Sequence, residues 1–223
     1  MNLIFFGPPS SGKGTYASGI SPILGIPKVS TGDIFRAEIT AGSALGKKVD
    51  KFLKTGELVP DDITIEVIKE RLKRPDCKKG FIADGFPRTI EQMKSLEKAV
   101  KIDLVLYFNW PEGVLEQKAL ARRTCEKCGE IYNIADIKTG KYRFPPVSPK
   151  KEGICDKCGG RLVQRKDDTI EVIRDRMKVY DKQSKPLIKY YKEKGIFRVV
   201  DVIGPPGVMI PIIVDLIKKN VKK

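Results

Sequence analysis

Residues 7–15 have the composition of a loop that binds phosphate. They read Gly-Pro-Pro-Ser-Ser-Gly-Lys-Gly-Thr and lie between an apolar run and a helical pattern. Glycines allow successive backbone N–H groups to turn toward one anion, and the N-terminus of a helix adds partial positive charge. Lys13 can then reach the β- and γ-phosphates of a nucleotide, and Thr15 can support phosphate or magnesium binding. The simpler alternative is a glycine-rich turn without a ligand.

Four cysteines form two pairs with the spacing of metal ligands. Two residues separate Cys125 from Cys128 and Cys155 from Cys158, and a glycine follows each pair. The pattern predicts a structural zinc site with four thiolate ligands, although the separation of the pairs is slightly longer than usual. Four protein ligands leave no open coordination position, so the metal would stabilise this segment and not catalyse. Disulfides, an iron–sulfur cluster and a redox dithiol are the alternatives. Cys77 stands apart, and we expect it to be a reduced thiol without a function.

The composition excludes several kinds of catalysis. The chain has no histidine, so it cannot form a Ser-His-Asp triad, use an imidazole base or bind zinc through imidazole. Its 43 lysines and arginines exceed its 28 acidic residues, which gives a net charge of +15. Such an excess is compatible with nucleic-acid binding, but a solvated basic surface is the simpler interpretation.

Short apolar runs alternate with longer helical patterns, and this order would position both groups of residues. The alternation is typical of a parallel sheet covered by helices, and the runs are continuously apolar because both faces of such strands are buried. Strands are predicted over residues 3–6, 27–29, 81–83, 104–108 and 197–200. Helices are predicted over residues 13–19, 33–41, 44–54, 61–74, 89–100, 111–123, 168–194 and 208–219.

Three residues give local signals for helix ends. Thr89 followed by Gln92 is typical of a capping box, and Pro111 suits the first position of a helix. Pro186 is expected to bend or split the helix predicted over residues 168–194, because proline removes a backbone hydrogen bond.

Residues 125–163 interrupt the alternation and are predicted to form a small inserted subdomain. Elsewhere, the apolar run of residues 3–6 is too short for a signal peptide or a membrane span. We therefore expect a cytoplasmic protein, in which thiols stay reduced. The C-terminal lysines are expected to be solvated, namely Lys218, Lys219, Lys222 and Lys223.

Six short motifs along almost the whole chain resemble the adenylate kinase family, one of the nucleoside monophosphate kinases. They comprise residues 7–15, 30–36, 56–61, 84–89 with Gln92, Arg122-Arg123, and 165–168 followed by Arg176. The resemblance implies the magnesium-dependent reaction ATP + AMP ⇌ 2 ADP, with these nucleotides as small-molecule partners. Phosphoryl transfer of this kind relies on positioning and on charge stabilisation by lysine, arginine and a metal ion, so it needs no histidine.

The resemblance also implies the fold. It is an α/β fold of the three-layer P-loop NTPase type, with a five-stranded parallel sheet, an inserted helical AMP-binding subdomain and a lid that holds zinc through four cysteines. The core would comprise residues 1–29, 60–121 and 165–223, the AMP-binding subdomain residues 30–59, and the lid residues 122–164. We expect a monomer that binds neither nucleic acid nor membranes.

The family's site residues carry over to matching positions. The expected catalytic residues are Lys13, Asp84, Arg88, Arg122, Arg165 and Arg176. The expected ATP-binding residues are Ser10, Ser11, Gly12, Lys13, Gly14, Thr15, Arg122, Ile131, Tyr132 and Gly204. The expected AMP-binding residues are Thr31, Arg36, Glu57, Leu58, Val59, Gly85, Phe86, Pro87, Arg88, Gln92, Arg165 and Arg176.

Within these sets the resemblance implies particular roles. Arg88 would clamp the α-phosphate of AMP, Gln92 would read its adenine, and Asp84 would act on magnesium through water. The four cysteines would hold one zinc ion in the lid. Asp167 and Asp168 either orient the arginines or stabilise the start of a helix, where carboxylates are favoured.

Two residues depart from the family pattern. Lys118 stands where most relatives carry an arginine that stacks on the adenine of ATP. Because an ammonium group stacks less well than a guanidinium group, we predict weaker discrimination among donor bases. Tyr16 stands where many relatives have glutamine, and the sequence offers no explanation for it.

Three other functions remain open on the sequence alone. The acceptor could be another nucleoside monophosphate, since only Thr31 and Gln92 favour adenine. A basic zinc-ribbon protein could bind nucleic acid, although an aromatic and basic stripe is missing. A simple P-loop ATPase would release phosphate without any acceptor.

Overall fold

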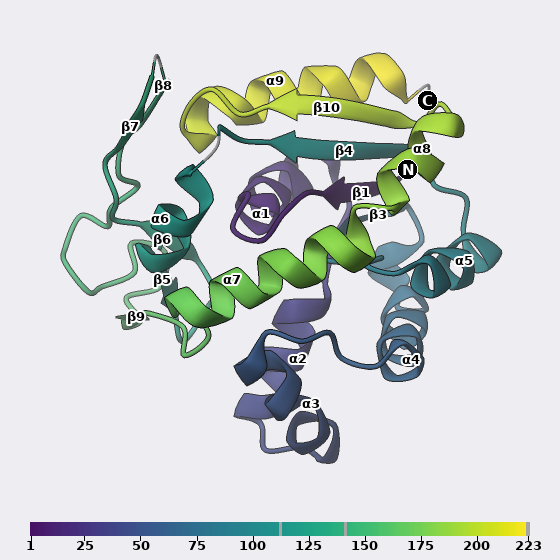
Figure 1. The fold of residues 1–223 in the computed structure, drawn as a ribbon, viewed down its shortest axis with the longest axis horizontal. Helices are drawn as coiled ribbons and strands as arrows, with labels where there is room; N and C mark the ends of the chain where they lie inside the picture. Colours follow the sequence, from purple (N-terminus) through teal and green to yellow (C-terminus); the bar gives the residue numbers. More distant parts are fainter. Residues whose placement is uncertain (112, 141, 222–223) are drawn as a thin grey trace.

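A five-stranded parallel sheet forms the centre of the computed structural model, which describes residues 1–111, 113–140 and 142–221 (Figure 1). Its strand order is β10-β4-β1-β3-β2, so the first strand of the chain is the central one. All five strands predicted from sequence are confirmed. Their bounds are β1 Asn2–Phe6, β2 Lys28–Ser30, β3 Phe81–Asp84, β4 Leu104–Asn109 and β10 Phe197–Asp201.

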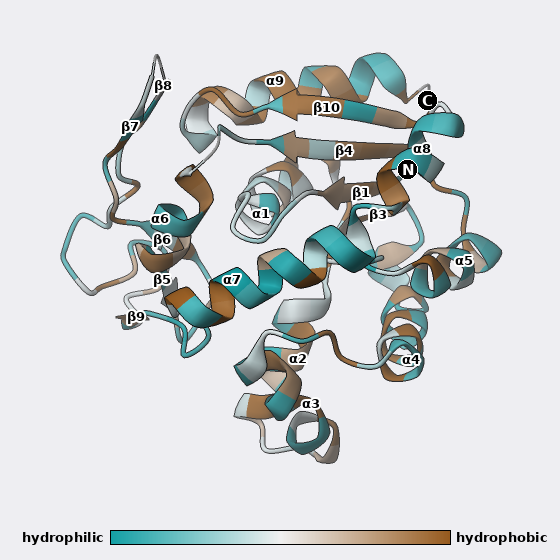
Figure 2. Cartoon of the chain, in the orientation of Figure 1, coloured by the Kyte–Doolittle hydropathy of each residue, from teal (hydrophilic) through white to brown (hydrophobic). Residues whose placement is uncertain are grey.

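Two apolar clusters cover the two faces of this sheet. Leu3 and Phe5 belong to one cluster, whereas Ile4 and Phe6 belong to the other. Neighbouring residues of a strand point to opposite faces, so this division explains why the run in β1 is continuously apolar. Helices α1 and α9 contribute to the first cluster, and α4, α5 and α8 to the second. Figure 2 shows hydrophobic residues along β1, whereas hydrophobic and hydrophilic residues are mixed along α7.

The helices follow the predicted order, although the helix predicted over residues 168–194 is divided and some ends differ. They are α1 Lys13–Leu24, α2 Thr31–Thr40, α3 Ala44–Thr55, α4 Asp61–Leu72, the 3₁₀ turn η1 Pro75–Cys77, α5 Ile90–Ala99, α6 Val114–Leu120, α7 Ile170–Val179, the π-helical turn η2 Tyr180–Ser184, α8 Leu187–Glu193 and α9 Pro206–Asn220. The chain divides between α7 and α8 close to Pro186, as predicted. Lys222 and Lys223 lie outside the described residues.

The prediction for residues 111–123 is wrong at both ends. The helix begins at Val114, after Gly113 in a left-handed conformation with φ 76°, so Pro111 is not its first residue. Residue 112 lies outside the described residues. The helix ends before Arg122 because Arg122 already pairs with Asn133 as the first residue of β5. Strand pairing in the inserted segment therefore overrides the local helical pattern.

Helices α2 and α3 form a separate helical insertion between β2 and α4. Its own apolar cluster contains Phe35, Val49 and Val59. Gly46 allows the two helices to approach closely, since a Cβ atom there would lie 2.2 Å from the backbone oxygen of Glu38. This insertion falls within the range predicted for the AMP-binding subdomain.

The inserted segment after α6 contains short antiparallel strands that the sequence did not predict. Strands β5 Arg122–Cys125, β6 Ile131–Asn133 and β9 Leu162–Val163 form one sheet. Strands β7 Ile137–Thr139 and β8 Tyr142–Phe144 form a hairpin that stands beside α6 (Figure 1). We call residues 122–164 the lid. Among the described residues, no helix is long and apolar enough to cross a membrane.

Candidate active site

The glycine-rich loop follows β1 and leads into α1, as the sequence predicts. Gly12 adopts a left-handed conformation with φ 80° and precedes the first residue of α1. Gly7 has φ 144°, and a Cβ atom there would lie 3.1 Å from the backbone oxygen of Phe108. The loop therefore needs glycine at both positions. Gly12 is needed for its backbone conformation, and Gly7 is needed for its conformation and for the close approach of β4.

Lys13 folds back over this loop. Its ammonium group donates to the backbone oxygens of Gly7 at 2.9 Å and Pro8 at 2.7 Å, and to the hydroxyl of Ser11 at 3.2 Å. Burial lowers the pKa of Lys13 to about 8; Asp84 opposes this shift, while Arg88 and Arg122 add to it. A phosphate group in the loop would offset the repulsion from these guanidinium groups.

Asp84 faces the same loop from the end of β3. A Cβ atom on Gly14 would lie 3.0 Å from the carboxylate oxygen Oδ2 of Asp84 and 3.8 Å from Cδ1 of Ile131 in the lid. The carboxylate, the loop and the lid therefore meet at Gly14. A hard cation prefers such oxygen ligands, so Asp84 and Thr15 are suitable partners for magnesium, directly or through water.

The turn after β3 organises the opposite end of the site. Gly85 has φ 75°, the Phe86–Pro87 peptide bond is cis, and the backbone oxygen of Gly85 accepts two hydrogen bonds. Thr31 donates to it through Oγ1 at 2.9 Å, and Arg88 through Nε at 2.8 Å. The bond from Nε fixes the arginine while its terminal nitrogens remain available to an anion.

Gln92 is buried, with 2% of its surface exposed, and its amide is oriented on both sides. Its Oε1 accepts from the backbone N–H of Arg88 at 2.7 Å, and its Nε2 donates to Asp61 at 2.7 Å. Asp61 also accepts from Thr89 at 2.7 Å. The sequence predicts no role for Asp61. The only indication in the sequence is that Asp61 is the last residue of a family motif.

The arginines predicted to be catalytic converge on the cleft and have different partners. Arg122 makes a two-point contact with Asp168, whose side chain is fully buried, and Arg176 pairs with Asp167. These ion pairs agree with the interpretation that the two carboxylates orient arginines; both residues also directly precede Thr169, the N-cap of α7, so they lie at the start of that helix as well. Arg165 bonds to Thr124 through Nε at 3.0 Å.

Two of these guanidinium groups lack a carboxylate partner in the described structure. Burial, together with the charge of Arg176, lowers the pKa of Arg88 to about 10, and burial with Arg122 and Arg36 lowers that of Arg165 to about 9. Both groups remain charged at neutral pH. Lys13, Arg88 and Arg165 thus form a concentration of positive charge that favours a polyanionic ligand.

One cleft connects these groups. It is lined by Lys13, Asp84, Arg88, Arg122, Arg165 and Arg176, and by the predicted residues of both nucleotide sites except Ser11. Ser11 is fully buried below the surface of the loop, where its hydroxyl holds Lys13. Gly204 lines the cleft from the turn after β10. Tyr132 lies mostly in the core of the lid, and 7% of its surface is exposed.

Tyr16, which the sequence left unexplained, packs beneath the loop. Its ring stacks on Phe108 with centroids 5.0 Å apart and an angle of 14° between the planes. A Cβ atom on Gly12 would lie 3.0 Å from this ring. Tyr16 therefore supports the underside of the loop from within the apolar core.

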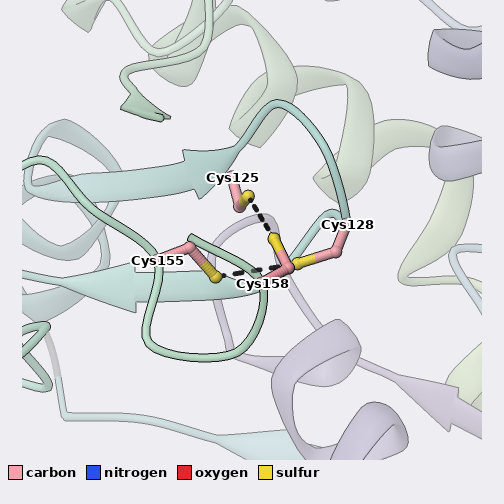
Figure 3. Close-up of side chains that lie close together, drawn as sticks. All are labelled: Cys125, Cys128, Cys155 and Cys158. Atoms are coloured by element: carbon pink, nitrogen blue, oxygen red, sulfur yellow. Dashed lines mark hydrogen bonds between the residues drawn. The ribbon is translucent and has the colours of Figure 1, made fainter. Parts of the chain in front are cut away.

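The four cysteines meet in the lid, as Figure 3 shows. Their sulfur atoms all lie within 4.8 Å of one another, with Cys125 and Cys158 at 3.4 Å and Cys128 and Cys155 at 3.7 Å. Four sulfurs at the usual Zn–S distance of about 2.3 Å in a tetrahedron lie about 3.8 Å apart. The donor set and its size therefore fit one zinc ion.

The backbone around the cysteines also fits a metal site. Gly129 and Gly159 have φ of 73° and 67°, and their N–H groups bond to the oxygens of Cys125 and Cys155 at 3.0 and 2.9 Å. Tyr132 donates to the sulfur of Cys155 at 3.7 Å. Apart from these cysteines, the apolar cluster at this site contains only Tyr132 and Leu162 among the described residues. So small a cluster needs a further constraint such as a metal.

Comparison with known proteins agrees with this geometry. A family model described as "Adenylate kinase" matches residues 5–196. A protein of Thermosipho melanesiensis with the name adenylate kinase is 48% identical over 206 residues, which cover 90% of this chain and 92% of the relative. Adenylate kinases of Archaeoglobus fulgidus and Clostridium tetani are 46% and 45% identical over 206 residues, with 90% of this chain and 90% and 91% of the relatives covered.

Proposed function

Because this chain belongs to the adenylate kinase family, we propose how its residues divide the work of the family reaction. The protein is a phosphotransferase that catalyses ATP + AMP ⇌ 2 ADP. The assignment of residues rests on one observation. Several cations line the same cleft, among them Lys13, Arg88, Arg122, Arg165 and Arg176. Two nucleotides bring several negative charges together there, and fixed cations stabilise them without reorganisation during transfer.

ATP binds on the side of the glycine-rich loop. The backbone of residues 10–15 surrounds the phosphates, and Lys13 exchanges its contacts with Gly7 and Pro8 for contacts with the β- and γ-phosphates. Ile131 and Tyr132 from the lid, with Gly204 after β10, cover the rest of the nucleotide. Support comes from the position of Ile131 next to Gly14 and from the lining of the cleft by all three residues.

AMP binds between the helical insertion and the turn after β3. Arg36 and Arg88 hold its phosphate, and the backbone of residues 57–59 lies along the base. Gln92 contacts the adenine through the hydrogen-bonding capacity of its amide that Arg88 and Asp61 do not use. The wall of the AMP site is formed by Thr31, Gly85, Phe86 and Pro87. The fixed amide of Gln92 supports a selective contact.

The γ-phosphoryl group moves between the two sides within reach of Arg88, Arg122, Arg165 and Arg176. Asp167 and Asp168 hold two of these arginines at fixed positions. Magnesium, bound with ATP near Asp84 and Thr15, supplies further charge stabilisation when it is present. Closure of the lid excludes water, which would otherwise accept the phosphoryl group.

The remaining features of the protein follow the family. One zinc ion, held by the four cysteines, stabilises the lid and takes no part in chemistry. We place the core at residues 1–29, 60–121 and 165–223, the AMP-binding subdomain at 30–59 and the lid at 122–164. The protein acts as a monomer in the cytoplasm and binds neither nucleic acid nor membranes.

Substitution of Arg88 tests the acceptor site. In an assay that couples ADP formation to a measurable signal, Arg88→Ala should lower kcat/KM for AMP roughly ten- to hundredfold, because a charged hydrogen bond contributes about 1.5–3 kcal/mol. Arg74→Ala, which removes an exposed arginine between α4 and η1, is the matched control and should leave activity unchanged. Full activity of Arg88→Ala would contradict the proposed clamp.

A comparison of acceptors tests the assignment of adenine. AMP should be phosphorylated much faster than UMP, CMP or GMP, and without an acceptor little phosphate should be released from ATP. A strong preference for UMP or CMP would contradict the role of Gln92. Rapid release of phosphate from ATP alone would favour a simple ATPase.

A further inference from the structure

Trp110, the only tryptophan of the chain, lies directly after β4 at the edge of the cleft. It is partly buried and packs against the apolar cluster that contains Phe5, Tyr16 and Phe108. The catalytic roles described above do not involve it, yet it contacts three separate parts of the molecule.

The first contact is with the phosphate-binding loop. The indole N–H of Trp110 donates to the backbone oxygen of Ser11 at 2.9 Å. Ser11 is fully buried, and its hydroxyl accepts from Lys13. A residue that fixes the backbone of Ser11 therefore also fixes one of the groups that hold the Lys13 ammonium.

The second contact is with Lys118 in α6. The ammonium group of Lys118 lies over the indole ring, 4.5 Å from its centroid. Burial and the charge of Arg122 lower the pKa of Lys118 to about 8. The face of an aromatic ring attracts a cation that has lost part of its water, so the ring holds the ammonium group in place.

The third contact is with the lid hairpin. The rings of Trp110 and Phe144 lie 4.8 Å apart between centroids, at an angle of 44°. Phe144 and Ile137 belong to the same apolar cluster as the core strands, although both come from the lid. The lid also reaches α6 through Asn133, which donates to the backbone oxygen of Lys118 at 2.7 Å.

We propose that Trp110 is a positioning residue for the ATP side of the reaction. Its indole ring connects the phosphate-binding loop, Lys118 and the hairpin of the lid. The inference rests on the proposed function, because it takes the loop and Lys118 to be the ATP side. Binding of ATP then moves or shields the indole ring, whereas AMP, at the other end of the cleft, does not.

Two substitutions separate the contacts of the indole. Trp110→Phe keeps a ring but removes the N–H donor, so KM for ATP should rise about three- to tenfold, the loss expected for one hydrogen bond. Trp110→Leu also removes the surface under Lys118 and Phe144, and its KM for ATP should rise further. In both variants KM for AMP should stay within about twofold of the wild-type value.

Phe197→Leu is the matched control, because it removes a buried aromatic ring from the apolar cluster on the other face of the sheet. It should change KM for both nucleotides by less than about twofold. A rise of both constants to the same extent in Trp110→Phe, or no rise at all, would overturn the proposal.

The emission of the single tryptophan gives a second measurement that does not depend on catalysis or on folding of a variant. In the wild-type protein, a non-hydrolysable ATP analogue should shift or quench the emission, and AMP at saturation should not. The same emission with and without the analogue, or equal responses to both nucleotides, would overturn the proposal. If the wild-type protein formed no ADP from ATP and AMP, the proposed function would fail, while the emission experiment would still report on Trp110.

Discussion

In the proposed site, Lys118 would place an ammonium group at the base of the donor, where the family pattern has the planar guanidinium of an arginine. The ammonium is compact and lies over the ring of Trp110 instead of offering a flat surface of its own. Under this proposal its contribution to donor binding would be mainly its charge, which does not distinguish one base from another.

The first prediction at the residue scale concerns the donor base. The wild-type protein should use ATP, GTP and CTP at similar rates, and Lys118→Arg should increase the preference for ATP, because a guanidinium group stacks on adenine. Rates with saturating AMP and each donor give the comparison. A sharp preference of the wild-type protein for ATP would contradict this role of Lys118.

Single residues also show what the sequence could and could not predict about the site. The motif residues around Lys13, Arg88 and Gln92 line one cleft. They could be predicted because each motif is a short continuous segment whose residue types suit the binding of a ligand. The contacts of Tyr16, Asp61 and Trp110 were not predicted. Their contacts are with residues far away in the sequence, such as Phe108 for Tyr16, and no local pattern records such contacts.

At the scale of elements, the helical insertion depends on the close approach of α2 and α3. Gly46→Ala should separate these helices, since the new Cβ atom would lie 2.2 Å from a backbone oxygen that cannot move aside easily. Stability should fall by about 1–3 kcal/mol, as in other overpacked sites, and KM for AMP should rise more than KM for ATP. Calorimetry and steady-state kinetics measure the two effects.

Gly207→Ala is the control for this experiment. Gly207 lies in α9, and no atom would come within 4 Å of an added Cβ. Stability should stay the same or increase slightly, because alanine favours the helix. If both variants behaved alike, the explanation through helix approach would be wrong.

The lid is the element in which the metal should matter most. If the four cysteines hold one structural zinc ion, as proposed, Cys128→Ser should abolish zinc binding and lower Tm strongly, with little change in affinity for AMP, because a structural metal contributes to folding. Metal analysis and thermal unfolding provide the readouts. Cys77→Ser, outside the lid, should retain zinc. A large loss of AMP affinity with unchanged Tm would show that the metal is not structural.

The lid also shows why some elements could not be predicted. Strands β5, β6 and β9 have two to four residues, too few for an alternating pattern. Glycine turns connect them, and the four cysteines gather beside them, so residues far apart in the sequence and not a local pattern bring these strands together. By contrast, β1 and β4 were predictable because burial on both faces requires a continuous apolar run.

For the whole molecule, the net charge of +15 raises the question of nucleic-acid binding. The structure directs part of this charge into the cleft, where Lys13, Arg88 and Arg165 lack a carboxylate partner in the described residues. Many exposed lysines pair with acidic neighbours on the same helix, for example Lys54 with Asp50 and Lys219 with Asp215. A surface of this kind is sufficient for solubility.

The protein should therefore not bind single-stranded RNA tightly at physiological salt. Any binding at low salt should weaken steeply as salt rises, because contacts between lysine and phosphate release counterions. Fluorescence anisotropy of a labelled oligonucleotide across a salt series measures this. Tight binding that persists at physiological salt would support the zinc-ribbon interpretation of the lid.

The central place of β1 has a consequence for the nascent chain. Its neighbours β3 and β4 begin only at Phe81 and Leu104, and β10, which closes the edge next to β4, begins at Phe197. At a synthesis rate of about 5–20 residues per second, the ribosome needs roughly 5–20 s to pass from β1 to β4. Before β3 has been made, the apolar strand β1 has no neighbouring strand, and before β4 has been made only one of its edges can be paired. A stalled fragment that ends before Phe81 would leave both edges of β1 unpaired, one that ends before Leu104 would leave one edge unpaired, and exposed strand edges of this kind are prone to aggregation.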